Sequence, residues 1–195
     1  MTGQEKTGAI LRVLLVEDCE DDALLLEREL TRGGYKPLVK RLDSPGAMSA
    51  ALPDQTWDLV LADWNLPRFS ALFAFEMLKC NGLDIPFIIV SGTIDEETAI
   101  AAMKAGAHDY VMKSNLGRLL PAIQRELCEA DDRRSRKRAE AALAAGEERL
   151  KLVARATNDA IWDWDLTTQK LGWNEGFQVL SGFRPYEVHK GVESW

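Results

Sequence analysis

Continuous apolar runs, rather than alternating apolar and polar positions, mark the first two thirds of the chain. Runs of about four to eight apolar residues are typical of strands that helices cover on both faces. A fifth run, Tyr35–Leu42, mixes lysine and arginine with aliphatic residues, which predicts an edge strand with one solvated side. The continuous runs are Leu11–Val16, Trp57–Ala62, Pro86–Val90 and Asp109–Met112.

Helical patterns fill the gaps between these runs. An acidic pair precedes Ala23–Thr31 and a glycine pair follows it, which are signals for the start and the end of a helix. Thr93–Glu96 has the pattern of a capping box and predicts a helix through Lys104. Strand and helix therefore alternate five times over roughly the first 130 residues, which predicts an α/β fold with a doubly wound parallel sheet. Further helices are predicted over 45–52, 70–79 and 116–129.

Polar residues stand at the ends of four predicted strands. They are Glu17 and Asp18, then Asp63, Ser91 and Lys113. The carboxyl ends of parallel strands meet at one edge of the sheet, so we expect these side chains to converge there. Carboxylates suit a hard cation such as Mg²⁺, and a lysine and a hydroxyl suit phosphoryl oxygens. The sequence predicts a phosphate and metal site at this edge.

Composition limits the alternatives. The chain has 195 residues, 46% of them hydrophobic, and no apolar run of about 18 residues that would predict a membrane span. The net charge of -7 argues against nucleic acid as a partner. Three cysteines without a CxxC pattern indicate reduced thiols, and hence a cytoplasmic protein. His108 is expected to be an exposed loop residue.

Four motifs, in this order and spacing, resemble the receiver domain of two-component response regulators. The resemblance implies a five-stranded parallel sheet of the flavodoxin-like order 2-1-3-4-5, and a switch controlled by phosphorylation. It covers about two thirds of the chain. The motifs are LLVED (Leu14–Asp18), DLVLADWNLP (Asp58–Pro67), PFIIVSGT (Pro86–Thr93) and AGAHDYVMK (Ala105–Lys113).

The resemblance also implies roles for the acidic residues. Asp63 matches the phosphoacceptor of the family. Glu17 and Asp18 match the acidic pair that, with Asp63 and the backbone carbonyl of Asn65, holds Mg²⁺. Glu17 stands where aspartate is commoner, and we expect this longer side chain to reach the metal through a water molecule.

Three further positions match the switch of the family. Ser91 matches the hydroxyl that moves on phosphorylation, Tyr110 the aromatic that then turns inward, and Lys113 the lysine that pairs with the phosphoryl group. Receivers usually have a cis proline after this lysine, but here Ser114 follows it. A cis bond before a residue other than proline costs about 2.5 to 4 kcal/mol, so we expect a trans bond.

The last third of the chain has a different character. We predict a receiver over 1–128, a helical linker over 129–156 and, over 157–195, the beginning of a PAS domain. The aromatic rhythm of Asn158–Phe183 resembles the first hairpin and helix of a PAS domain. Two interpretations of the helix over 116–156 remain open: a coiled coil that makes a homodimer, and a solvated monomeric linker.

Other function classes fit less well. A haloacid-dehalogenase-type phosphatase needs a second acid where this chain has Asn65, and the acidic loop after the first strand would repel a flavin phosphate. The chain contains no kinase motif, so we expect no enzyme with a turnover substrate of its own. The expected phosphodonor is a histidine kinase or a phosphotransfer protein. The alternative is a degenerate receiver that acts as a protein-interaction or dimerisation module without being phosphorylated.

Overall fold

The computed structural model describes residues 8–64, 66–67, 69–92, 100, 103–104, 106–157, 160–168 and 170–182. The chain divides into two compact units, residues 1–134 and 135–195. Each unit is described by itself below.

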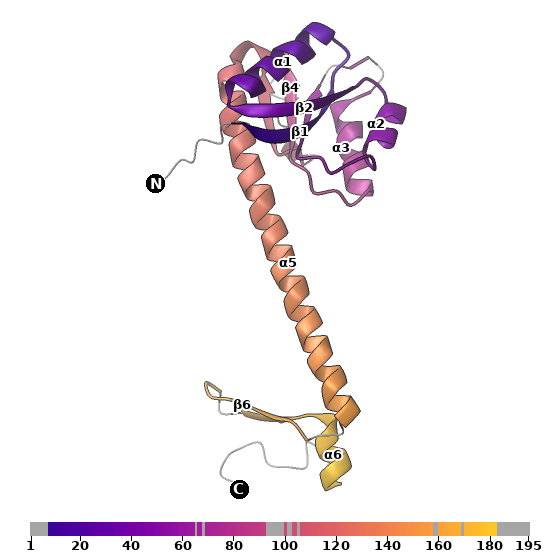
Figure 1. The fold of residues 1–195 in the computed structure, drawn as a ribbon, viewed down its shortest axis with the longest axis vertical. Helices are drawn as coiled ribbons and strands as arrows, with labels where there is room; N and C mark the ends of the chain where they lie inside the picture. Colours follow the sequence, from indigo (N-terminus) through magenta and orange to yellow (C-terminus); the bar gives the residue numbers. More distant parts are fainter. Residues whose placement is uncertain are drawn as a thin grey trace. The chain divides into compact units, whose positions relative to one another are not determined.

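The first unit is built on a five-stranded parallel sheet (Figure 1). The strand order is β2-β1-β3-β4-β5, which confirms the predicted doubly wound, flavodoxin-like fold. The strands are β1 (Ala9–Val16), β2 (Tyr35–Leu42), β3 (Leu59–Asp63), β4 (Phe87–Ser91) and β5 (Asp109–Met112).

The register of the strands fixes where the functional edge lies. Val16 of β1 pairs with Ala62 of β3, so the residues that follow β1 lie beside Asp63. At the other side of β3, Asp63 pairs with Val90, one residue before Ser91 ends β4. Met112 of β5 in turn pairs with Ser91, which places Lys113 just beyond the same edge. The polar strand ends therefore converge as the sequence predicted.

The helices of this unit begin and end close to the predicted positions. The predicted helix that opens at Thr93 lies largely outside the described residues. The long helix begins at Leu119 and not at Leu116, because the segment before it forms a tighter 3-10 helix interrupted by the non-helical backbone of Asn115. The helices are α1 (Glu20–Arg32), α2 (Pro45–Ala51), α3 (Ala71–Cys80), η1 (Lys113–Arg118) and α5 (Leu119–Thr157), of which α5 ends in the second unit.

Two apolar layers pack on the two faces of the sheet. One layer joins alternate strand residues, such as Leu14, to side chains of α2 and α3, including Met48. The other joins the intervening residues, such as Leu15, to side chains of α1 and the start of α5, including Ile123. Every residue of β3 and β4 is buried, as expected for central parallel strands.

The second unit contains the later part of α5 and a small α+β element. Strands β6 (Trp162–Asp165) and β7 (Lys170–Trp173) form an antiparallel pair, and α6 (Glu175–Ser181) follows them. These elements agree with the predicted hairpin and helix. The Asn174 side chain caps α6 by accepting a hydrogen bond from the backbone N–H of Phe177, whose ring packs 4.3 Å from that of Trp173. Within the described residues, no helix combines the length and the apolar character needed to cross a membrane.

Candidate functional site

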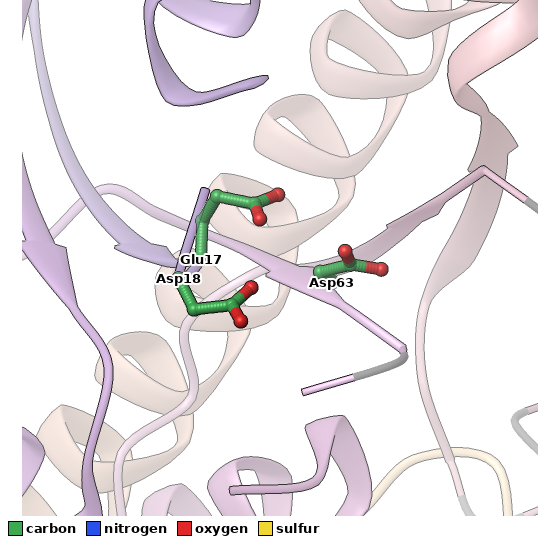
Figure 2. Close-up of side chains that lie close together, drawn as sticks. All are labelled: Glu17, Asp18 and Asp63. Atoms are coloured by element: carbon green, nitrogen blue, oxygen red, sulfur yellow. The ribbon is translucent and has the colours of Figure 1, made fainter. Parts of the chain in front are cut away.

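An acidic cluster lies at the carboxyl edge of the sheet. Glu17 and Asp18 directly follow β1, and Asp63 is the last residue of β3. Figure 2 shows the side chains of Glu17 and Asp18 extending from the end of β1 toward the neighbouring strand that carries Asp63. One carboxylate oxygen from each residue lies within 4.8 Å of the other two.

Lys113 directly follows β5 and contacts this cluster at the same edge of the sheet. Its ammonium group donates hydrogen bonds to Glu17 Oε2 at 2.7 Å, to Asp63 Oδ2 at 2.9 Å and to Asp22 Oδ2 at 2.5 Å. Burial by itself would lower the pKa of Lys113, but the bonds to these three carboxylates outweigh burial and raise its pKa above the ordinary value. Lys113 is therefore a permanently charged group that faces the cluster.

Glu17 is the most buried member of the cluster. Its side chain is 1% exposed, and desolvation raises its pKa although the bonds to Lys113 and to the backbone N–H of Cys19 act in the opposite direction. Glu17 Oε1 accepts the bond from Cys19 and Oε2 accepts the bond from Lys113. Because both oxygens have protein partners, Glu17 suits contact with a metal through water better than direct ligation.

The donor set fits a hard divalent cation. The ligands of octahedral Mg²⁺ lie about 2.0 to 2.1 Å from the ion, so oxygens in one shell are about 3 to 4 Å apart. The 4.8 Å spread of the cluster is slightly wider than that. Asp18 is exposed, whereas Asp63 and Glu17 are buried, so Asp18 is the member of the cluster most open to solvent. Asn65, the remaining predicted ligand, lies outside the described residues.

The two predicted switch residues lie on neighbouring strands. Ser91 is fully buried at the end of β4, next to the strand that carries Asp63. Tyr110 of β5 is partly buried and packs against the apolar layer that includes α2 and α3. No cis peptide bond occurs among the described residues, so the bond between Lys113 and Ser114 is trans, as predicted.

Two residues at this edge were missed by the sequence analysis. Asp22 was interpreted only as negative charge at a helix start, but it accepts a bond from Lys113. Arg41 was interpreted as the solvated side of an edge strand, but its guanidinium donates to the backbone carbonyl oxygens of Asp18 at 3.0 Å and Glu17 at 3.4 Å. No pattern in the sequence points to the Arg41 contact, which follows from the parallel pairing of β1 and β2 that brings Arg41 opposite Leu15.

His108 lies in a loop as predicted, but the expectation that it is exposed was wrong. Its ring is partly buried, accepts a hydrogen bond at Nδ1 from the backbone N–H of Phe87, and packs edge-on against Phe75. Phe87 carries the first backbone N–H of β4, which needs an acceptor. The imidazole of His108, the residue just before β5, supplies it. The three cysteines are exposed and form no disulfide.

A pocket of about 390 Å³ opens beside the cluster. It is lined by Asp18, Asp43, Ser44, Leu66 and Pro67. Asp18 therefore belongs both to the acidic cluster with Asp63 and to the lining of an adjacent open pocket.

This fold and this cluster define a class of protein. Residues 13–124 match the family model described as the response regulator receiver domain. The chain belongs to the response regulator receiver family.

Curated relatives agree with this assignment. The chain is 31% identical over 103 residues to the cell cycle transcriptional regulator CtrA of Caulobacter vibrioides, a match that covers 53% of this chain and 44% of CtrA. It is also 31% identical over 105 residues to the phosphate regulon transcriptional regulatory protein PhoB of Klebsiella pneumoniae, covering 52% of this chain and 44% of PhoB. The matched segment thus spans less than half the length of these relatives.

Solved structures share the fold. The signal receiver domain of a putative LuxO repressor protein from Vibrio parahaemolyticus aligns with a TM-score of 0.54 at 24% identity, covering 62% of this chain and 92% of that one. NtrX from Brucella abortus aligns with a TM-score of 0.58 at 26% identity, covering 65% of this chain and 29% of NtrX.

Proposed function

We propose that this chain is a phosphorylation-controlled switch that accepts a phosphoryl group on Asp63 with the help of Mg²⁺. The observation that carries the proposal is the position of the Asp63 carboxylate. It lies beside an acidic pair that suits a cation, and an ammonium group donates to it at 2.9 Å. Membership of the receiver family supports the same conclusion.

In the proposed reaction, a phosphoryl group moves from an oxygen or nitrogen atom of the donor to a carboxylate oxygen of Asp63. One Asp63 oxygen forms a bond to phosphorus while the bond from phosphorus to the donor's leaving atom breaks, and the leaving group keeps the electron pair. Asp18 and Asp63 would hold Mg²⁺ directly, Glu17 would act through water, and the backbone carbonyl of Asn65 would complete the protein's share. The ion would supply positive charge that offsets the charge of the phosphoryl oxygens.

The remaining residues transmit the change. Lys113 pairs with the phosphoryl group, the hydroxyl of Ser91 donates to a phosphoryl oxygen, and Tyr110 turns inward as that hydroxyl moves. Ser91 and Tyr110 lie on adjacent strands, which supports a coupled movement. The phosphodonor is a histidine kinase or a phosphotransfer protein.

We further propose that the helix after the receiver carries the signal to a PAS-like region and joins two copies of the chain. Exposed apolar side chains follow its later part, including Leu143 and Leu150, seven residues apart. The small hairpin formed by β6 and β7 supports a PAS-like element. The names of CtrA and PhoB describe them as transcriptional regulators, and the absence of a nucleic-acid partner for this chain stays a prediction.

Mass spectrometry of the intact protein tests the proposal. The full chain is incubated with acetyl phosphate, with and without Mg²⁺, and compared with Asp63→Asn and Asp54→Asn. We expect a gain of about 80 Da, one phosphoryl group, in wild type and in Asp54→Asn only when Mg²⁺ is present. Asp54 is a matched control because its side chain pairs with Lys40 on the surface.

The opposite result would identify a different function. No gain in wild type at any donor concentration would support the degenerate receiver, a docking module that is not phosphorylated. Labelling retained in Asp63→Asn would assign the phosphoacceptor to another residue.

A further inference from the structure

The Lys113 ammonium is fully engaged by carboxylates. A lysine ammonium has three hydrogens to donate, and three bonds reach Glu17, Asp22 and Asp63. Two of these acceptors belong to the cluster already described. The third, Asp22, comes from the first turn of α1 and has the shortest of the three distances, 2.5 Å.

A phosphoryl group on Asp63 would need one of these three donors. If Lys113 is to pair with a phosphoryl oxygen, as the proposed function requires, one present acceptor must be displaced. Glu17 is poorly suited to leave because its side chain is 1% exposed and a released buried carboxylate would lose its compensation. Asp63 itself carries the phosphoryl group and stays beside the ammonium.

Asp22 is the acceptor that costs least to release. Its side chain is 37% exposed, against 11% for Asp63, so water can replace the lost bond. Asp22 also lies in the first turn of α1, where the helix dipole stabilises a carboxylate without help from Lys113. The bond to Asp22 can therefore break without leaving a buried or uncompensated charge.

Charge repulsion acts in the same direction. Three carboxylates bond the one ammonium, and a fourth, that of Asp18, lies in the same acidic cluster. An incoming phosphoryl group adds further negative charge, and each carboxylate that remains close to Lys113 competes with it for the same cation. Among the carboxylates that bond Lys113, Asp22 is neither a proposed metal ligand nor the phosphoacceptor.

We propose that Asp22 is an exchangeable partner of Lys113: it holds the ammonium while Asp63 is unmodified and gives up its place to a phosphoryl oxygen when Asp63 is phosphorylated. This inference rests on the proposed function. Asp22 is a positioning residue that acts through Lys113, and it makes the unphosphorylated state more stable relative to the phosphorylated one.

Kinetics of labelling test this role. The rate constant for phosphorylation by acetyl phosphate with Mg²⁺ is measured for wild type, Asp22→Asn and Asp21→Asn. We expect Asp22→Asn to react about fivefold faster, since an ion pair of this exposure is worth about a fivefold change in an equilibrium. Asp21→Asn removes the same charge from the same turn and should stay within about twofold of wild type, because the Asp21 side chain is exposed.

A double-mutant comparison separates exchange from general repulsion. In a Lys113→Met background, Asp22→Asn should no longer accelerate labelling, because the shared partner is gone. Persistence of the acceleration in that background would show that Asp22 acts by charge alone, and a slower reaction of Asp22→Asn would show that it is a required tether. Either result overturns the inference.

A spectroscopic measurement on the metal-free protein gives a second readout. The NMR signal of the Lys113 side-chain ammonium at neutral pH should shift in Asp22→Asn and stay in place in Asp21→Asn, because Asp22 is one of its three hydrogen-bond partners. An unchanged signal in Asp22→Asn would overturn the inference. If wild type is not labelled at all, the proposed function fails, whereas normal labelling with no effect of Asp22→Asn refutes only the exchange.

Discussion

The two units of this chain differ in how far their strands and apolar side chains are buried. In the first unit every residue of the central strands β3 and β4 is buried between two helical layers. In the second unit every residue of strand β6 is exposed, and so are the apolar side chains of the later part of α5. The first unit therefore has a covered apolar core, whereas apolar side chains of the second unit remain exposed among its described residues.

This difference indicates how the two parts are stabilised. Stability in the first unit comes from apolar area removed from water on both faces of a sheet. A two-stranded hairpin such as β6 and β7 is marginal by itself. We therefore expect the first unit to fold independently, and the second to depend on covering by further structure.

Truncating one leucine in each unit should give the largest expected difference in the free energy of unfolding. Leu14→Ala should lower the free energy of unfolding by about 2 to 5 kcal/mol, because the side chain is fully buried in β1 and leaves a cavity. Leu150→Ala, at a side chain that is 67% exposed, should change it by less than about 0.5 kcal/mol. Urea unfolding of the full chain at low protein concentration measures both.

The concentration of the protein is the informative variable in this experiment. If Leu150→Ala became strongly destabilising only at high concentration, a second copy would be covering the helix, in agreement with the proposed homodimer. A loss for Leu150→Ala that equals the loss for Leu14→Ala at every concentration would contradict the contrast between the two units.

The sequence was sufficient for the sheet and for most of its acidic edge. Short continuous apolar runs that alternate with helical patterns are typical of buried parallel strands, whose carboxyl ends meet at one edge. Asp63 and Lys113 could therefore be expected to meet although 50 residues separate them. Asp22 and Arg41 could not be predicted in this way. Their contacts depend on how α1 is rotated over the strand ends and on the register of an edge strand, and a hydrophobic pattern specifies neither for a charged residue.

The boundary between the two units can be tested with two arginines on the same helix. Arg133 donates to Asp84, in the loop before β4, at 3.1 Å and approaches His108, whereas Arg136 pairs with Glu140, one turn further along α5. We expect Arg133→Ala to cost about 1 kcal/mol, since its pair is partly buried and joins separate segments.

Arg136→Ala is the matched control for this experiment. It should cost at most about 0.5 kcal/mol, because both side chains of its pair are exposed and lie on one helix. Both variants are compared by the urea midpoint of the full chain. Equal losses would mean that α5 remains part of the first unit beyond Arg134.

The pH dependence of stability gives the smallest expected effect. It tests the environment of His108, which Arg133 approaches near the end of the first unit. Burial, and then the charge of Arg133, lower the pKa of His108, while Glu126 and Asp84 act in the opposite direction. Above the ordinary histidine pKa of about 6.5, the ring is neutral in both folded and unfolded chains and contributes no slope. As the pH falls below that value, the unfolded chain binds a proton first, so the free energy of unfolding decreases until the folded pKa is passed.

His108→Asn should remove this part of the slope, because an amide oxygen can still accept the bond from Phe87 N–H but cannot titrate. The measurement is the difference between variant and wild-type unfolding free energies from pH 8 to pH 5. Carboxylates such as Glu17, whose raised pKa makes the opposite contribution at acid pH, act in both proteins and cancel in that difference. Parallel curves would contradict the lowered pKa of His108 and the burial of its ring that causes it.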